Sequence, residues 1–221
     1  MGHSLISRRG TEYGTLFKML MNNELTEITS EMLDGITSIR ENAFKNNTYI
    51  LNVTIPNSVI SIGSAAFREC TALTNITIGQ NVTSIGSTAF YGCTTLTSVT
   101  IPSAVTIIDF SAFAGCTALE DLTIESGVTS IGSQAFYNCT SLESVTIPSS
   151  VTSIDNYAFY SCTSLSSVTV QATTPPTLGS SAFGGTSNNL IIYVPANSVD
   201  TYKAASGWSD YASKIQAIPN N

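Results

Sequence analysis

The chain has 221 residues, of which 43% are apolar, and its net charge is −7. Only 10% of the residues are charged, against about 25% in an average soluble domain, so the surface must be polar but largely uncharged. No basic residue lies between Glu69 and Asp200, which argues against nucleic acids and anionic membranes as partners, because both require lysine and arginine. No apolar run is long enough to predict a transmembrane segment, and residues 1–20 lack the apolar centre of a secretory signal.

Residues 1–24 precede the regular part of the sequence and are expected to form an N-terminal tail and a helical cap. Leu16, Phe17, Leu20 and Met21 recur at helical spacing, which favours a short amphipathic helix. Four further apolar residues then predict a degenerate first rung, and these are Leu25, Ile28, Leu33 and Ile39.

A repeat of 23 residues runs through the middle of the chain. Its marker is an Ala-Phe pair, with the phenylalanines at Phe44, Phe67, Phe90, Phe113, Phe136, Phe159 and, one residue late, Phe183. Cysteines keep the same period at Cys70, Cys93, Cys116, Cys139 and Cys162. Leucines do so at Leu73, Leu96, Leu119, Leu142 and Leu165. A fixed period of about 20 to 29 residues with the spacing L-x-x-L-x-L is the signature of leucine-rich repeats.

One rung, residues 96–118, illustrates the structure that the pattern predicts. Val99 and Ile101 alternate with polar residues, which predicts a short strand with one buried face. Val105 and Ile108 predict a second extended stretch that points inward. The Ala-Phe pair is then expected to form one turn of helix, with the phenylalanine in the core. A single rung cannot bury these residues by itself, so the rungs must stack.

The C-terminal end departs from the repeat. Residues 172–176 break the pattern, residues 190–195 predict a last strand, and residues 197–217 predict one or two short helices. An exposed terminal rung would leave an apolar surface and an open sheet edge. Trp208, which is the one tryptophan of the chain, is therefore expected to cover the last rung.

These patterns together predict an α/β leucine-rich-repeat solenoid with a parallel concave sheet, short helical turns on the other side and helical caps at both ends. The expected boundaries are 1–24 for the tail and N-terminal cap, 25–189 for the repeats, and 190–221 for the C-terminal strand and cap. A parallel β-helix is the alternative fold. It would lack both the helical turn at Ala-Phe and the curvature.

The unit C-T-S-L-x-S-V-T-I-P-S-S-V-T-S-I-G-x-x-A-F closely resembles the BspA-type leucine-rich repeats over about residues 25–217. That family occurs on surface proteins of mucosal bacteria and some protists, and its known members bind host matrix proteins or other bacteria. The last strand and helices also resemble the segment that closes such arrays in gut bacteria, including prophage-encoded proteins. The resemblance implies adhesion, but its motif residues are core positions, so no binding residue can be transferred by motif.

The five cysteines are the most conspicuous reactive groups. Their spacing of 23 residues does not match a zinc site, and the lone histidine, His3, lies in the N-terminal tail. Cysteines on adjacent rungs would point in the same direction, which suits a disulfide poorly. We expect a ladder of buried free thiols that act as small apolar residues, with disulfides and metal binding as alternatives, and no cofactor.

Catalytic groups are scarce in the repeat region. Without a histidine there, no nucleophile–base pair of the Ser-His or Cys-His type can be built. The carboxylates that could form a glycosidase pair are Glu69, Asp109, Glu120, Asp121, Glu125, Glu143 and Asp155. Asp109 and Asp155 fit turn positions, and the others are scattered, so we expect a protein that is not an enzyme.

Outward-facing strand positions form the candidate binding surface, and six of them are a threonine ladder at Thr54, Thr77, Thr100, Thr123, Thr146 and Thr169. Threonine pairs stabilise exposed sheets, which explains the ladder without a ligand. The functional interpretation is a hydroxyl-rich wall for a protein or a glycan. Acidic residues interrupt the wall, either as a solvated cluster or as a site for a basic peptide or a cation. The candidate binding residues are Thr77, Thr100, Asp121, Thr123, Glu125 and Thr146.

The sequence thus favours an extracellular or cell-surface binding module that is not an enzyme and is expected to be a monomer. Its partner would be a protein or a glycan on a host or bacterial surface. The alternative is a structural spacer in a prophage tail or surface appendage, and a glycan-active enzyme is a distant third hypothesis.

Overall fold

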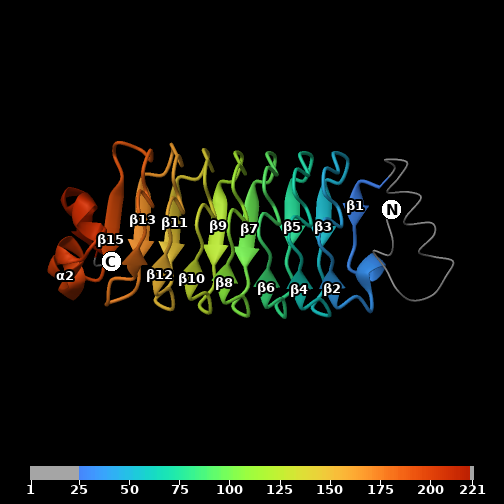
Figure 1. The fold of residues 1–221 in the computed structure, drawn as a ribbon, viewed down its shortest axis with the longest axis horizontal. Coiled ribbons are helices and arrows are strands. Elements are labelled where there is room, and N and C mark those ends of the chain that lie inside the picture. The colour runs from blue at the N-terminus through green and yellow to red at the C-terminus, as the bar shows by residue number, and fades with distance from the viewer. Residues whose placement is uncertain (1–24, 220–221) are drawn as a thin grey trace.

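The computed structural model describes residues 25–219, which form a stack of rungs along one axis (Figure 1). The predicted tail and N-terminal cap at 1–24 lie outside the described residues. Each of the first seven rungs contributes one strand to each of two parallel strand rows and then returns through a series of turns (Figure 1). The predicted solenoid of rungs about 23 residues long is therefore confirmed.

The first strand row carries the longer strands and is divided into two parallel sheets. The five-stranded sheet contains β1 (Glu27–Ile28), β3 (Asn52–Thr54), β5 (Asn75–Thr77), β7 (Ser98–Ile101) and β9 (Asp121–Ile124). The four-stranded sheet contains β11 (Ser144–Ile147), β13 (Ser167–Val170), β15 (Ile191–Val194) and β16 (Ile215–Ala217). The outward side of this row is called the sheet face below. In Figure 1 the rungs follow a straight axis, so the expected concavity is not visible in this view.

The second strand row is continuous. Its seven parallel strands are β2 (Ser38–Ile39), β4 (Ser61–Ile62), β6 (Ser84–Ile85), β8 (Ile107–Ile108), β10 (Ser130–Ile131), β12 (Ser153–Ile154) and β14 (Thr177–Leu178). A short 3-10 helix, η1 (Glu31–Leu33), joins β1 to β2. The pairs Ser38↔Ser61 and Ile62↔Ile85 show the 23-residue register, so residues at one repeat position lie side by side.

The Ala-Phe segment forms the predicted turn, but the turn is not helical. In the rung around Phe67, the Ala66 N–H donates to Gly63 O, whereas the Phe67 N–H donates to Ala89 O of the next rung. Ala65 and Glu69 have φ values of 52° and 58°, the left-handed conformation that a type II turn requires at its third residue. Successive backbone N–H groups thus donate alternately to a carbonyl within the turn and to a carbonyl of the neighbouring rung. A helical turn would direct them all along the helix axis and leave the rungs unbonded.

The core contains a continuous stack of phenylalanine rings. Successive rings from Phe44 to Phe183 have centroid separations of 5.0 to 5.6 Å and interplanar angles of 4° to 14°. The rings are parallel because each rung repeats the same backbone conformation about 5 Å further along the axis. Stacked aromatic pairs add to the burial of their apolar surface, so this ladder is a main stabilising element of the array.

The cysteines form a second buried ladder, as predicted. All five are buried and unpaired, and each thiol donates to the carbonyl oxygen of a phenylalanine 26 residues earlier at 3.1 to 3.3 Å. Burial removes water from these thiols and raises the pKa of Cys70 and Cys116 from 9.0 to about 12. The pKa of Cys93 and Cys139 is raised for the same reason. Thiols held in the neutral form behave as small apolar residues.

The C-terminal cap covers the last rung with aromatic side chains, as predicted. It consists of η2 (Ala196–Ser198), α2 (Val199–Ala204) and η3 (Trp208–Lys214). Trp208 is buried, and its Nε1–H donates to Pro176 O at 2.7 Å. The Tyr202 hydroxyl donates to Ala172 O at 2.7 Å. These bonds fix the lid to the backbone of the irregular segment that the sequence pattern had marked as a break.

Tyr211 of η3 replaces the rung that is missing at the end of the stack. In the preceding rungs, a phenylalanine N–H donates to an alanine carbonyl of the next rung, as Phe159 does to Ala182 O. Phe183 has no such rung after it, and its N–H donates to the Tyr211 hydroxyl at 3.3 Å. The Tyr211 ring also meets the Phe183 ring edge to face.

We predict that Tyr211→Phe lowers the free energy of unfolding by about 1 to 2 kcal/mol, because the Phe183 N–H loses its acceptor in a partly buried position. Urea denaturation followed by circular dichroism measures this change. Tyr137→Phe is the matched control, since the Tyr137 side chain is exposed. Equal stability of the two variants would contradict the role of Tyr211 as a cap.

Because its thiols are buried, the cysteine ladder predicts that the folded protein becomes less stable at alkaline pH. The unfolded chain loses its thiol protons near pH 9, whereas the folded chain holds them to about pH 12 at Cys70 and Cys116. The folded state therefore binds more protons in this range, and the free energy of unfolding falls as pH rises by about 1.4 kcal/mol per unit for each such thiol. Urea titrations at pH 8 and pH 10.5 test the fall, and Cys116→Ala should make it shallower. A pH-independent midpoint would contradict it.

Candidate functional site

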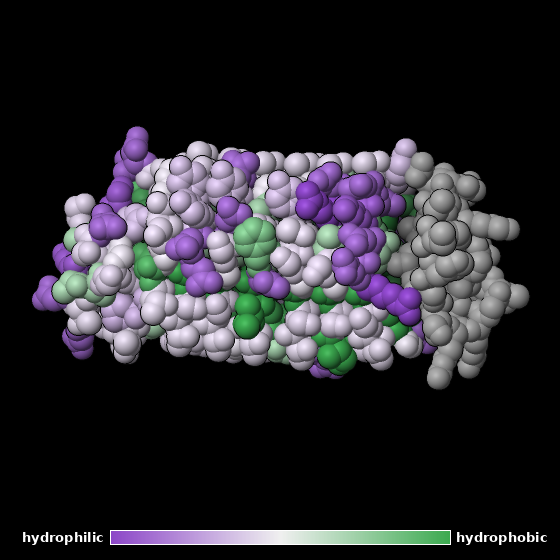
Figure 2. Space-filling view, viewed as in Figure 1, coloured by the Kyte–Doolittle hydropathy of each residue, from purple (hydrophilic) through white to green (hydrophobic). Residues whose placement is uncertain are grey.

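The threonine ladder lies on the sheet face, as the alternation of the strands predicted. Thr77, Thr100, Thr123 and Thr146 are all exposed, and Thr100 pairs directly with Thr123. The ladder continues to Thr169, whose partner on the next strand is Tyr193. Figure 2 shows that much of the face in this view has near-neutral hydropathy, with the more hydrophilic residues in separate groups. The sheet face thus presents hydroxyl groups with little charge.

The backbone ladder of the sheet face is interrupted between β9 and β11. Within residues 25–219 no residue pairs join these two strands, although β10 and β12 of the same two rungs pair normally. The strands on either side are well paired, because β7–β9 and β11–β13 each have four residue pairs. The break is therefore local to the sheet face and does not divide the solenoid.

A proline at the end of β11 removes one of the bonds that are missing at the break. Glu125 and Gln171, which hold the equivalent position after β9 and β13, donate their N–H groups to the preceding strand at 3.1 and 3.0 Å. Pro148 has no N–H and cannot make this bond. Pro102 has the same position after β7, and there the pairing with β5 is reduced to Asn75↔Ser98. Proline at this position weakens the contact with the preceding strand in both rungs.

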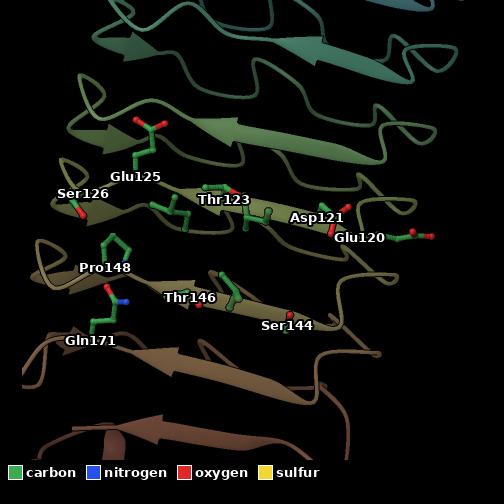
Figure 3. Close-up of a pocket in the computed structure, with 12 residues that line it drawn as sticks. Glu120, Asp121, Thr123, Glu125, Ser126, Ser144, Thr146, Pro148 and Gln171 are labelled. Carbon is green, nitrogen blue, oxygen red and sulfur yellow. The ribbon is translucent and has the colours of Figure 1, made fainter. Parts of the chain in front are cut away.

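The break opens a hollow of about 560 Å³ between β9 and β11 (Figure 3). Its residues come from both strands and from the segments that follow them: Glu120, Asp121, Leu122, Thr123, Ile124, Glu125, Ser126, Ser144, Val145, Thr146, Pro148 and Gln171. Thr123 and Thr146 lie along its length, and Pro148 and Gln171 lie at one end (Figure 3). The hollow is thus mostly lined by hydroxyl, carboxylate and amide groups.

Leu122 forms part of the floor of this hollow. The equivalent inward positions on the neighbouring strands, Val99 and Val145, are 3% exposed, whereas Leu122 is only partly buried. The sheet therefore exposes apolar surface at the break. An apolar floor beneath a polar rim is the arrangement found in many small binding sites.

Glu125 and Gly127 hold the loop after β9 against the previous rung. The Glu125 Oε2 accepts a hydrogen bond from the Ser103 N–H at 2.9 Å. Gly127 approaches the Ser103 carbonyl so closely that an added Cβ would overlap with it. The loop is drawn towards the β7 rung, on the side away from β11. Glu125 therefore has a structural role in addition to its place at the hollow.

A second hollow of about 430 Å³ lies at the start of the same strands. Its residues are Glu120, Asp121, Ser141, Glu143, Ser144 and Ser164. It shares Glu120, Asp121 and Ser144 with the first hollow, so three carboxylates lie around one corner of the break. Glu120, Asp121 and Glu143 are all exposed.

Four of the six predicted binding residues, Asp121, Thr123, Glu125 and Thr146, line the first hollow. Thr77 on β5 and Thr100 on β7 are exposed on the same face but lie outside the hollow. Sequence reasoning did not select Leu122, Ser126, Ser144, Pro148 or Gln171, which also line it. Pro148 was the available signal, because a proline after a strand removes a ladder bond.

The site offers acceptors and no cation of its own. No lysine, arginine or histidine lies between Glu69 and Tyr202. In the described part of the chain, no group of three or more His, Cys, Asp or Glu residues could hold a metal ion, and no helix is long and apolar enough to cross a membrane. The cysteines are buried in the core and do not contribute to the hollow.

The fold and the repeat together define a leucine-rich-repeat protein of the parallel β-solenoid kind. The family described as "BspA type Leucine rich repeat region" matches residues 17–117 and 84–205 with six copies. The chain therefore belongs to the BspA-type leucine-rich-repeat family, whose solved relatives include bacterial surface proteins. This confirms the resemblance carried by the repeat unit.

Three solved structures are similar over most of this chain. A leucine-rich cell surface protein from Faecalibacterium prausnitzii is 37% identical, with a TM-score of 0.62 over 72% of this chain and 43% of its own. A leucine-rich-repeat protein from Bacteroides ovatus is 29% identical, with a TM-score of 0.66 over 82% and 45%. The T. pallidum leucine-rich-repeat protein is 27% identical, with a TM-score of 0.68 over 76% and 78%.

This chain therefore spans less than half the length of the first two of these proteins. A search of functionally curated proteins gives no match. The similarities accordingly define the fold and the family, and the activity of the site must be argued from its own residues.

We predict that Pro148→Gln restores pairing between β9 and β11, because glutamine supplies the N–H that Gln171 uses in the next rung. Hydrogen exchange followed by NMR should show the amides of Ser144 and Thr146 slowing by about fivefold, the equivalent of about one hydrogen bond. Ser149→Gln is the matched control and should leave these amides unchanged. The explanation is wrong if the native β11 amides are already as protected as those of β13.

Proposed function

We propose that this protein is a non-enzymatic binding module that acts on the outside of a bacterial cell and holds a protein or glycan partner on its sheet face. The observation that carries the proposal is the hollow between β9 and β11, where the sheet is interrupted and four of the predicted binding residues meet. The neighbouring strands β11 and β13, by contrast, are joined by four residue pairs.

The composition of the sheet face supports binding. Short, exposed hydroxyl side chains such as Thr123 and Thr146 lose little conformational entropy when a partner covers them. The stacked rungs hold these side chains at fixed separations, so the surface is already organised before a partner arrives. The family and the similar F. prausnitzii cell surface protein support an extracellular position.

Catalysis has no comparable support at this site. A glycosidase pair needs a proton donor, and neither Glu120 nor Asp121 has a buried environment that would supply one, because both side chains are exposed. The nucleophile–base pairs used in acyl transfer require a histidine that this region lacks. The spacer hypothesis needs only a rigid stack, and it leaves the recess on the sheet face without a purpose.

A screen of the purified protein against arrays of glycans and host matrix proteins tests the proposal. We predict that Thr146→Trp weakens binding of any array ligand at least about tenfold, because the indole fills the hollow and a tenfold loss is about 1.4 kcal/mol. Thr77→Trp is the matched control, since Thr77 has the same repeat position outside the hollow.

Surface plasmon resonance with each variant separates the outcomes. Retained binding by Thr77→Trp together with loss in Thr146→Trp supports the hollow as the binding site. Equal binding by both variants would place the ligand elsewhere on the molecule and would overturn the proposal for this face.

A further inference from the structure

The side chains that line the break between β9 and β11 indicate which class of partner the sheet face binds. This inference rests on the proposed function. We propose that the face docks a basic, extended peptide segment of a partner protein, with a lysine or arginine side chain inserted between β9 and β11. Three observations lead to this occupant: the charge around the break, the exposed apolar floor, and the interrupted backbone ladder.

Within residues 25–219 no salt bridge compensates the charge around the break. Glu120, Asp121 and Glu143 share one corner, and the nearest basic residues in the sequence are Arg68 and Lys203. In the described residues the single salt bridge, between Arg68 and Glu69, is remote from this corner in the sequence. A polyanionic glycan would be repelled by these carboxylates, whereas a cationic side chain would be attracted to them.

The apolar floor of the hollow favours a cation that carries an aliphatic chain. Leu122 lines the hollow and is partly exposed. Asp121 and Glu120 stand at one end of the hollow (Figure 3). Lysine and arginine have an aliphatic stem that packs on apolar surface and a charged head that remains at a polar rim. A bare metal ion would leave Leu122 uncovered, and in the described residues no group of three or more His, Cys, Asp or Glu residues could hold it.

The interrupted backbone ladder between β9 and β11 offers hydrogen-bond acceptors to the bound side chain. Before β9 and β13, the residue that precedes the strand donates its amide to the previous rung, as Glu120 does to Thr97 O at 2.9 Å and Ser166 does to Glu143 O at 2.9 Å. The break between β9 and β11 lacks the pairing that continues these bonds on either side within residues 25–219. Carbonyl oxygens outside a ladder are acceptors for the several N–H groups of a guanidinium.

The test uses a fluorescein-labelled extended peptide with two arginines in an alternating Thr/Val background, and the same peptide with glutamine at both arginine positions. Fluorescence anisotropy on the full chain should show saturable binding of the arginine peptide, and weaker binding of the glutamine peptide. Binding should also weaken as salt is raised from 0.05 to 0.5 M, about a threefold shortening of the screening length.

Two double variants that remove the same charge locate the site. Asp121→Asn with Glu143→Gln should weaken the arginine peptide at least about tenfold, the usual scale of a lost charge-assisted contact. Glu27→Gln with Asp155→Asn removes two exposed carboxylates elsewhere and should change the affinity less than about twofold, since distant exposed charges are screened. All four positions are exposed, so folding is preserved in both proteins.

Equal weakening by the two double variants would show attraction to net charge alone and would overturn this inference. So would the absence of arginine-peptide binding to the unmodified protein. If that peptide fails while an array ligand is still lost in Thr146→Trp, the proposed function stands and only the basic occupant is wrong. If the array ligand is unaffected by Thr146→Trp, the proposed function itself fails.

Discussion

The structure depends on backbone hydrogen bonding between rungs at a 23-residue register. It operates in both strand rows and through alternate amides of the turn segment, so each rung is bonded to its neighbours on several sides. Residues such as Ala65 and Glu69 accept a left-handed conformation to make this possible, at a cost of roughly 1 kcal/mol each. The phenylalanine stack and the thiol ladder follow from the register, because identical rungs place identical side chains next to one another.

Such an array has two intrinsic weaknesses, its ends and any rung that cannot bond to its neighbour. At the C-terminal end Tyr211, Trp208 and Tyr202 take the place of a further rung, and their side chains hydrogen-bond to the backbone of the last rung and of the segment at residues 172–176. In the interior, Pro148 removes a donor and is tolerated because β10 and β12 remain paired in the second row. One row can therefore open while the other preserves the axis.

The different roles of the two strand rows explain why the candidate site lies on the sheet face. The turns and the second row keep the rungs in register, so the sheet face is free to vary. At β9 and β11 it varies in three ways together, by the loss of pairing, by the partial exposure of Leu122 and by the carboxylates at one corner. A binding surface on a repeat protein is expected to arise where one rung departs from the consensus, since the consensus residues are needed for stacking.

The sequence by itself determined the period, the buried positions of Phe, Cys and Leu, the outward threonines and the aromatic cap, because all of these follow from local alternation and from the requirement that each rung bury its apolar residues. It also directed attention to Asp121 and Glu125. The form of the Ala-Phe turn and the break beside β9 were decided by the tertiary structure, because both depend on which backbone amides find a partner in another rung. Hydrogen bonds between residues 22 to 26 positions apart cannot be predicted from the local sequence pattern. The effect of Pro148 can be recognised only when the strand that lies beside it in the preceding rung is known.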